Sequence, residues 1–281
     1  MIPNIFHYVL FKPAIGETKP FSLPYYLAVE SAFQLNQPER IYLHADFTPS
    51  GYWWEKISHR VTVVHTQAPD VFMGRTISHV AHKADVVRLQ VLKTYGGIYM
   101  DLDTICVKPF QPLYHHKFVM GEELIPVYIP RNWRQVLKFN IRKILTSGGD
   151  PGKNQNRKIC SAVLLSEKNS AFVNEWLNSY QTFRSKGRDD YWNEHSGVLP
   201  LKLLKAHGDM ATLLGSYAFH YPLYKDEHLK KMFEEVHEFP EAYAHHLWES
   251  FSWDKYLSKL TEEDIRNRDT TYNIIARRFL K

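Results

Sequence analysis

The sequence predicts an α/β fold with a mostly parallel sheet flanked by helices. In the first third of the chain, short runs rich in β-branched and aromatic residues alternate with stretches of helical spacing. A further helical stretch leads through two glycines into another apolar run. This alternation is typical of parallel strands whose connecting helices cover the faces of the sheet. Because we find no linker, we expect one domain over residues 1–281.

The expected elements follow in chain order. In the first half, strands are expected at 5–11, 40–45 and 61–66, with helices at 23–36 and 51–57. The next helix, over 78–95, is expected to have Ser78 as its N-cap and to end at Gly96. In the second half, strands are expected at 118–122, 159–166 and 242–248, and helices at 170–183, 199–206 and 225–233. A final helix should follow the capping-box sequence at 261–265.

The composition is that of a globular, enzyme-sized chain. It has 281 residues, 44% of them hydrophobic, and a formal net charge of +5, which suits anionic partners such as phosphates without indicating nucleic acid. The start lacks a basic n-region and no apolar run approaches the roughly 20 residues of a membrane span, so we expect a cytoplasmic protein without signal peptide or transmembrane segment. The two cysteines, Cys106 and Cys160, lack the spacing of a zinc site and are expected to be ordinary buried thiols.

Residues 95–103, YGGIYMDLD, place two carboxylates at the end of an apolar strand. Strand alternation would put Asp101 and Asp103 on one face, about 7 Å apart, while Leu102 faces the core. Two neighbouring buried carboxylates are unfavourable unless a cation compensates them, and Mn²⁺ or Mg²⁺ prefers such oxygen ligands. The acids also lie at the carboxyl edge of the sheet, where α/β folds bind ligands. We therefore favour a metal and phosphate site over a solvated strand end.

The helix before this motif carries Asp85 and Arg88, three residues apart and therefore on one side. The pair is either a plain surface ion pair, which contributes little, or part of the site into which the helix leads. Both interpretations remain open.

The segment HKADVVRLQVLKTYGGIYMDLD resembles the sugar-binding DxD region of glycosyltransferase family 32. The resemblance is specific over 81–109 and looser at IPNIFHYV, WNEHSGVLPLKLL and AHHLWESFSW. It implies a GT-A fold, with a Rossmann-like nucleotide-sugar-binding half over about 1–110 and a variable acceptor-binding half with a C-terminal closing element over about 111–281. It also implies a metal-dependent, retaining transfer of a sugar from a nucleotide diphosphate sugar.

By position, the resemblance implies that Asp103 coordinates Mn²⁺ or Mg²⁺ and that Asp101 bonds the ribose or sugar of the donor. Asp85 and Arg88 correspond to the helix pair that holds the donor sugar and its phosphate side. Asp101, Asp103 and Arg88 are therefore the expected catalytic residues, and no protein nucleophile is expected. The late segment should supply one further metal ligand; the candidates are His246, which we prefer, Glu249 and Ser252. A packed histidine beside Trp248 is the alternative for His246.

The expected donor-binding residues also include part of the first strand and two tryptophans, which could equally be core residues: His7, Tyr8, Val9, Trp248 and Trp253. Relatives often have a tryptophan just after the histidine-containing segment, where this chain has Leu10 or Phe11. The base is therefore less defined by the resemblance. A uridine diphosphate sugar is the favoured donor and a guanosine diphosphate sugar the second.

The acceptor is expected to be a glycan or a lipid-linked glycan. Residues 132–145 have the pattern of a basic amphipathic helix, which either contacts an anionic membrane or packs as an ordinary surface helix. Glu122 and Glu123 either orient an acceptor hydroxyl or lie in a solvated loop. Two other functions stay open: a catalytically silent nucleotide-sugar- or glycan-binding protein, and, less favoured, a metal-dependent phosphohydrolase, which would need more ligands.

Overall fold

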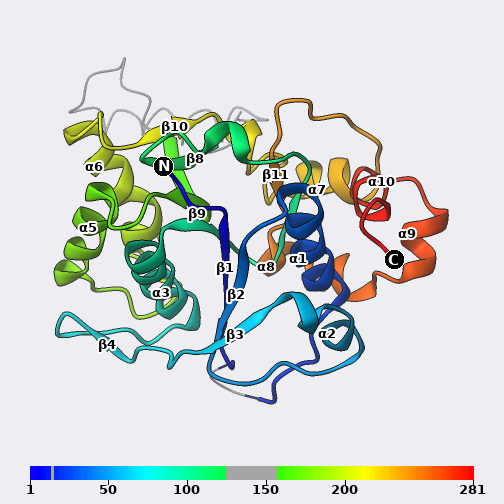
Figure 1. Cartoon of the computed structure of the whole chain (residues 1–281), viewed down its shortest axis with the longest axis horizontal. Helices are drawn as coiled ribbons and strands as arrows, with labels where there is room; N and C mark the ends of the chain where they lie inside the picture. Colours follow the sequence, from blue (N-terminus) through cyan, green and yellow to red (C-terminus); the bar gives the residue numbers. More distant parts are fainter. Residues whose placement is uncertain (14–15, 125–156) are drawn as a thin grey trace, which may run out of the picture.

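A seven-stranded sheet forms the centre of the computed structural model, which describes residues 1–13, 16–124 and 157–281 (Figure 1). The strand order is β10-β8-β9-β6-β1-β2-β3. Its strands are β1 (Ile5–Leu10), β2 (Arg40–Ala45), β3 (Thr62–His65), β6 (Gly97–Met100), β8 (Phe118–Leu124), β9 (Arg157–Ser166) and β10 (Thr212–Leu214). Only β9 runs antiparallel to its neighbours β6 and β8. The predicted α/β class with a mostly parallel sheet is confirmed.

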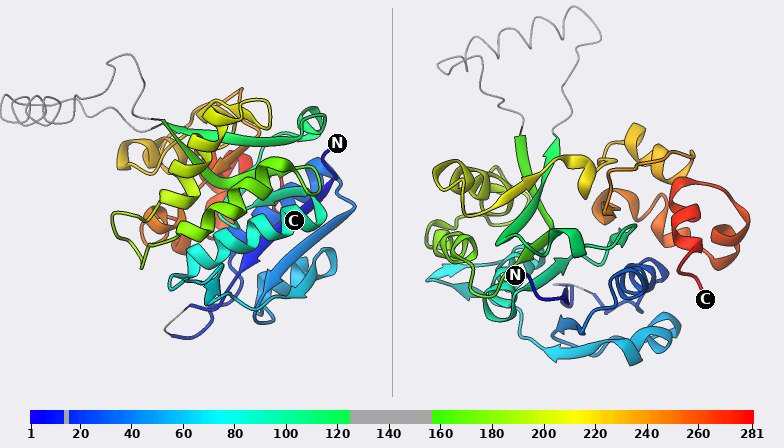
Figure 2. Two further views of the ribbon diagram at one scale, coloured as in Figure 1. Left: turned by 90° about the vertical axis from the view of Figure 1, so that its left-hand side faces the viewer. Right: turned by 45° about the horizontal axis from the view of Figure 1, so that its top comes forward.

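Helices cover both faces of this sheet (Figures 1 and 2). One face carries α3 (Val80–Tyr95), α5 (Ala171–Asn178) and α6 (Leu199–Ala206). The other carries α1 (Leu23–Asn36) and α2 (Tyr52–Ile57), and α7 (Asp226–Phe233), α9 (Glu262–Asn267) and α10 (Thr271–Arg277) extend the same apolar core beyond them. In β6, Ile98 and Met100 pack on the α1 side and Tyr99 on the α3 side. Both faces of the central strands are thus buried, as in parallel sheets generally.

Smaller elements complete the fold. Two short pairs of antiparallel strands join β4 (Val71–Phe72) to β5 (Arg75–Thr76) and β7 (Thr104–Cys106) to β11 (Ala244–His246). A one-turn helix, α8 (Glu249–Ser252), follows β11, and a π-helical turn spans Glu194–Val198. Short 3₁₀ turns lie at Ser58–Arg60, Gln111–Leu113, Ser179–Thr182, Ser216–Ala218 and Leu257–Lys259. Of these elements, the β7–β11 pair and α8 bring the C-terminal region to Asp101, Leu102 and Asp103, which we call the DXD motif.

Several boundaries differ from the prediction. The N-cap of α3 is His79 and not Ser78, because the His79 ring accepts a hydrogen bond from the Ala81 N–H at 3.2 Å. The single helix expected in the tail is two helices, α9 and α10, and the strand expected at 242–248 covers only β11. The expected helix at 132–145 lies outside the described residues. Within the described chain, no helix has the length and apolarity needed to cross a membrane.

Two glycines connect α3 to β6. Gly96 ends α3 with φ 69°, and Gly97 follows with φ 101°, both in a region that disfavours other residues. A Cβ on Gly96 would lie 2.6 Å from the backbone nitrogen of Lys168, and one on Gly97 would lie 2.3 Å from the Ile5 carbonyl oxygen. Glycine is therefore required here by both backbone conformation and close strand packing. The predicted helix stop at Gly96 is confirmed.

Candidate active site

A cavity of about 390 Å³ lies where β1 and β6 end. Residues Val9, Leu10 and Phe11 line it at the end of β1, and the aspartates of the DXD motif line it after β6. Further lining residues come from α1, α3, β9 and the segment around α8. This position is the carboxyl edge of the parallel strands, where α/β sheets bind ligands.

The two aspartates of the motif stand on a turn and not on a strand. β6 ends at Met100, and the next three residues lead the chain into β7. Because of this turn, a carboxylate oxygen of Asp101, one of Asp103 and a ring nitrogen of His246 all lie within 4.8 Å of one another. The separation of about 7 Å expected from strand geometry is therefore wrong. Leu102 is buried in the core, as predicted.

Asp101 is half-buried and groups with three buried side chains, and we call these four residues the arginine cluster: Asp85, Arg88, Tyr99 and Asp101. Arg88 Nη2 lies 3.1 Å from Asp85 Oδ1 and 3.5 Å from Asp101 Oδ1. Arg88 Nη1 donates to the carbonyl and hydroxyl oxygens of Ser161 at 2.6 and 2.8 Å. The Tyr99 hydroxyl donates to Asp101 Oδ1 at 2.5 Å. With Arg88 only 5% exposed, the pair is not a plain surface ion pair.

Asp103 belongs to a second group, the histidine cluster: Asp103, His246 and Glu249. His246 Nε2 lies 3.2 Å from Asp103 Oδ2, and the Glu249 N–H donates to the same oxygen at 2.7 Å. The Leu247 N–H donates to the Asp103 carbonyl at 2.7 Å. Pairing of β7 with β11 places His246 opposite Thr104, next to the motif. These contacts join two segments that are far apart in the sequence.

The two aspartates differ in their protonation behaviour. Burial raises the pKa of Asp101; Arg88 offsets this only in part, and Asp103 adds to it. Burial also acts to raise the pKa of Asp103, but the charge of His246 and the hydrogen bonds to the carboxylate outweigh it, and this pKa is lowered. Burial acts to lower the pKa of His246, but Asp103 outweighs it and holds the pKa well above its usual value. In the absence of a metal, Asp103 and His246 therefore form an ion pair.

Glu249 is a third acid beside the motif. Burial, followed by the negative charge of Asp103, raises the pKa of Glu249 to about 7. Its two carboxylate oxygens accept from the Tyr25 hydroxyl at 2.8 and 2.9 Å. Trp248 precedes it with φ 57°, a left-handed conformation uncommon for a bulky residue. This conformation turns the chain from β11 into α8 and directs the Glu249 N–H to Asp103.

Other predicted site residues are not brought into the cavity. The Ser252 hydroxyl donates to the Leu247 carbonyl at 2.6 Å, and the side chain is fully buried. Trp253 packs against Tyr25, whereas Trp248 does line the cavity.

In the first strand, only Val9 of the three predicted donor-binding residues lines the cavity. His7 is fully buried, with its ring nitrogens 3.1 Å from His44 Nε2 and 2.9 Å from the Gly96 carbonyl. The Tyr8 hydroxyl donates to the Ala28 carbonyl at 3.4 Å, inside the core.

Glu122 and Glu123 do not lie in a solvated loop, because they belong to β8 and are buried. Burial raises the pKa of Glu123, although Lys158, 3.8 Å away, acts in the opposite direction. Neither side chain is among those lining the cavity. Their predicted role toward an acceptor stays a prediction.

Several cavity residues carry no local signal in the sequence. Tyr25, Ser161 and Trp192 reach the cavity from α1, β9 and the loop before the π-helical turn. Cys160 is not an ordinary buried thiol: it is half-buried, lines the cavity and has its Sγ 3.7 Å from His246 Nδ1. Only long-range pairing brings these side chains to the motif.

The chain is similar to known glycosyltransferases. Residues 24–119 match the family described as glycosyltransferase sugar-binding region containing DXD motif. A curated relative, glucan organizing enzyme 1 of Cryptococcus neoformans var. grubii serotype A, is 35% identical over 286 residues, which cover 100% of this chain and 71% of that protein.

Solved structures with a similar arrangement are also glycosyltransferases by title. The PaToxG glycosyltransferase is 18% identical, with a TM-score of 0.45, and the match covers 73% of this chain and 70% of that one. Mouse xyloside xylosyltransferase 1 is 14% identical, with a TM-score of 0.46, and the match covers 86% of this chain and 97% of that one. The galactosyltransferase LgtC, in complex with donor and acceptor sugar analogs, is 11% identical, with a TM-score of 0.46. The match covers 99% of this chain and 96% of that one.

Proposed function

This chain belongs to the glycosyltransferases whose sugar-binding region contains a DXD motif, and on that premise we propose that it transfers a sugar from a nucleotide diphosphate sugar. We propose further that the transfer depends on Mn²⁺ or Mg²⁺ and retains the anomeric configuration. The observation that carries this proposal is the convergence of Asp101, Asp103 and His246 at a cavity on the carboxyl edge of the sheet. The sheet with helices on both faces agrees with the GT-A fold expected for this family.

The ligand atoms present fit a divalent cation. Metal–oxygen distances of about 2.1 Å place the ligands of one ion roughly 3–4 Å apart, so small side-chain rotations from separations of 4.8 Å or less would suffice. Two carboxylates suit a hard ion, and the imidazole nitrogen favours Mn²⁺ over Mg²⁺. The bound cation would stabilise the negative charge of the departing diphosphate.

The protein's own residues hold and orient the donor in this proposal. Arg88 acts as a positioning residue, because its Nη atoms are engaged by Asp85, Asp101 and Ser161. Asp85 and Asp101 would accept hydrogen bonds from hydroxyl groups of the sugar or ribose. Trp248 lines the cavity beside the Asp103 side and would help to exclude water there.

For the donor, we favour a uridine diphosphate sugar, with a guanosine diphosphate sugar second. For the acceptor, we favour a polysaccharide, since the name of the curated relative refers to glucan. A lipid-linked glycan is the other acceptor that we consider, because residues 132–145 combine basic and apolar side chains. Flotation with vesicles containing anionic lipid tests it: binding supports a membrane-presented acceptor, and its absence removes that version.

Thermal unfolding with UDP or GDP and Mn²⁺ tests donor binding. A nucleotide at a hundred times its dissociation constant should stabilise the protein by about 2.7 kcal/mol. Asp103→Asn should abolish this gain, whereas Asp209→Asn, at an exposed aspartate, should keep it. If neither nucleotide stabilises the wild type with Mn²⁺ or Mg²⁺, donor binding is refuted.

Product analysis tests the chemical step separately. With the nucleotide sugar that binds and a glucan oligosaccharide, NMR of the new linkage should show the anomeric configuration of the donor. An inverted product would contradict the retaining mechanism. Binding without any transfer or hydrolysis would favour a nucleotide-sugar-binding protein.

A further inference from the structure

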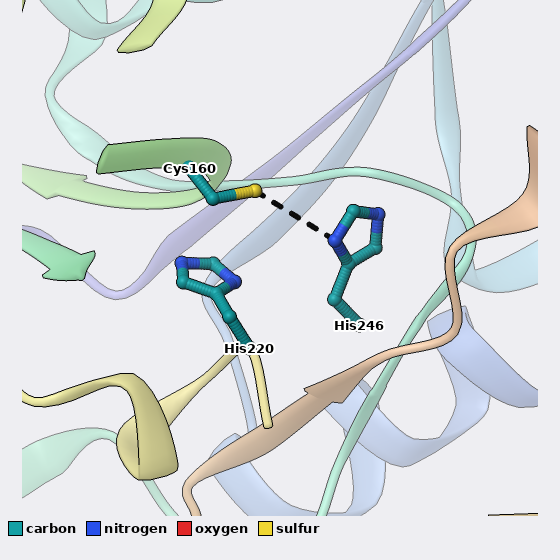
Figure 3. A group of neighbouring side chains, drawn as sticks. All are labelled: Cys160, His220 and His246. Atoms are coloured by element: carbon teal, nitrogen blue, oxygen red, sulfur yellow. Dashed lines mark hydrogen bonds between the residues drawn. The ribbon is translucent and has the colours of Figure 1, made fainter. Parts of the chain in front are cut away.

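A second group of metal-binding side chains lies beside the DXD motif. Cys160 from β9, His220 from the loop before α7 and His246 from β11 point toward one another (Figure 3). Their ligand atoms lie within 4.8 Å of one another, and Cys160 Sγ is 3.7 Å from His246 Nδ1. Three separate segments of the chain therefore converge on one point.

His220 is a buried imidazole at the centre of this group. Its side chain is fully buried, and within the described chain neither ring nitrogen has a hydrogen-bond partner. The backbone carbonyl of Cys160 lies near the ring, but neither ring nitrogen has the geometry of a hydrogen bond to it. An unpartnered buried imidazole is unfavourable, and a cation bound at one nitrogen would remove that cost.

The space for this ring depends on a glycine in β8. A Cβ on Gly121 would lie 2.7 Å from His220 Nε2 and 2.8 Å from Phe219 Cδ2. A larger residue at this position would collide with the imidazole ring. The backbone of the central sheet thus forms a cradle for His220.

The ligand chemistry differs from that of the DXD motif. A thiolate with two imidazoles prefers Zn²⁺ and similar thiolate-binding ions over Mn²⁺ or Mg²⁺. Three protein ligands leave a fourth position for water or another donor. Cys160 and His246 line the cavity, which offers an ion an entry path.

We propose that Cys160, His220 and His246 form a second cation site that takes Zn²⁺ or a similar thiolate-binding ion. His246 belongs to both sites, with Nε2 toward Asp103 and Nδ1 toward Cys160. A neutral imidazole has only one unprotonated nitrogen, so ligation through Nδ1 leaves the proton on Nε2. Zn²⁺ at this site therefore competes with a cation bound by Asp101 and Asp103. The competition, but not the site, rests on the proposed function.

Absorption of the Co²⁺-loaded full chain tests the site without any activity measurement. Thiolate ligation gives a sulfur-to-cobalt charge-transfer band in the near ultraviolet, and Zn²⁺ should displace it. Cys160→Ser should lose the band, and Cys106→Ser is the matched control, because Cys106 is the other cysteine and its thiol contacts Met100 in the core. A band that survives Cys160→Ser, or the absence of any band in the wild type, would overturn the proposal.

His220→Gln provides a second variant, with the unfolding transition confirming that the protein folds. The band should weaken and the Co²⁺ affinity should fall at least about tenfold. An unchanged affinity in the folded variant would show that His220 is not a ligand. A variant that does not fold leaves Cys160→Ser to decide.

Titration with Mn²⁺, followed by its electron paramagnetic resonance signal, tests the competition. Zn²⁺ should release Mn²⁺ from the wild type but much less from Cys160→Ser, which keeps Asp101, Asp103 and His246. Equal release from both would place Zn²⁺ at the DXD motif and contradict the competition. If the wild type binds no Mn²⁺, the proposed function fails, whereas the cobalt experiment still decides the second site.

Discussion

The arginine and histidine clusters each neutralise one aspartate of the DXD motif, but with partners of different chemistry. Asp101 faces Arg88, whose guanidinium keeps its charge at any accessible pH. Asp103 faces His246, which can give up its proton and then bind a metal through the same nitrogen. The arginine cluster is therefore suited to hold a carboxylate in place, whereas the histidine cluster is suited to exchange a proton for a cation.

Removal of the arginine should have the largest effect. Arg88→Met would leave the buried Asp85 and the half-buried Asp101 without their counter-charge, and breaking a buried ion pair such as that with Asp85 typically costs about 3–5 kcal/mol. The free energy of unfolding from denaturant titration measures this loss. Arg88→Met combined with Asp101→Asn should recover part of it, since one buried charge is then removed.

Arg184→Met is the matched control for this substitution. Arg184 forms a bidentate ion pair at the surface, where it donates to both carboxylate oxygens of Glu194. Water and salt screen such pairs, so the loss should be much smaller. Comparable losses in the two variants would contradict the view that burial makes the arginine cluster important for the free energy of unfolding.

The histidine cluster should show its difference in metal binding. His246→Gln should weaken Mn²⁺ binding at least about tenfold, and calorimetry measures the affinity directly. Burial acts to lower the pKa of His246, but Asp103 raises it by more, so Mn²⁺ binding near neutral pH should release one proton more in the wild type than in the variant. Repeating the titration in buffers of different ionisation enthalpy counts that proton.

His245→Gln is the control on the same strand. His245 is the neighbouring residue of β11, and its Nδ1 faces the Tyr221 carbonyl at 2.9 Å, away from the motif. The His245→Gln variant should bind Mn²⁺ with the wild-type affinity and release the same proton. Loss of binding in both variants would mean that disturbance of β11, and not ligation by His246, is responsible.

The hydroxyl that holds Glu249 should have a smaller effect. Tyr25→Phe removes a hydrogen bond to both carboxylate oxygens of Glu249 and should cost about 1 kcal/mol of unfolding free energy. Tyr52→Phe is the control, because its hydroxyl lies 3.5 Å from Glu262 at the surface. If the two losses are equal, the hydrogen bond to Glu249 contributes nothing specific to the histidine cluster.

The smallest effect near neutral pH should come from histidines that pair with each other. Burial, followed by the charge of His44, lowers the pKa of His7 to about 3, and burial lowers the pKa of His44 to about 4. The unfolded chain binds these protons more tightly than the folded protein. The contribution of the two neutral histidines to stability is therefore fully present above about pH 6.5 and is lost as the pH falls toward their folded pKa values of about 4 and 3. At pH 6 the loss should be about 0.8 kcal/mol per histidine.

Denaturant titrations at pH 7.5 and pH 6 measure this slope. His44→Gln should lose about 0.8 kcal/mol less than the wild type over this range, because one buried neutral histidine is removed, and His207→Gln is the control for an exposed histidine. An equal loss in His44→Gln and in the wild type would contradict the assignment of a neutral pair.

Much of the arginine cluster could be predicted from the sequence. Asp85 and Arg88 are one helical turn apart, Gly96 ends their helix, and Asp101 follows within five residues of that stop. The spacing of the two carboxylates was wrong because the strand ends at Met100, a boundary that alternation of apolar residues does not reveal.

The histidine cluster was only partly predictable. His246 and Glu249 were candidates through a resemblance, yet Glu249 lies 146 residues beyond Asp103, and Cys160 lies 86 residues before His246. No spacing rule covers such distances.

By itself, the sequence determined the order of most longer strands and helices, the glycine stop and the local neighbours of the DXD motif, because these depend on periodicity and backbone conformation within a few residues; short strands such as β10 were not predicted. Only the tertiary structure decided which distant side chains share the cavity. The pairing of β7 with β11 and the left-handed turn at Trp248 bring His246 and Glu249 to Asp103. His220, which has no hydrogen-bond partner among the residues that the structure describes, reaches Cys160 for the same reason, because burial and contacts are properties of the packed chain and not of any short segment.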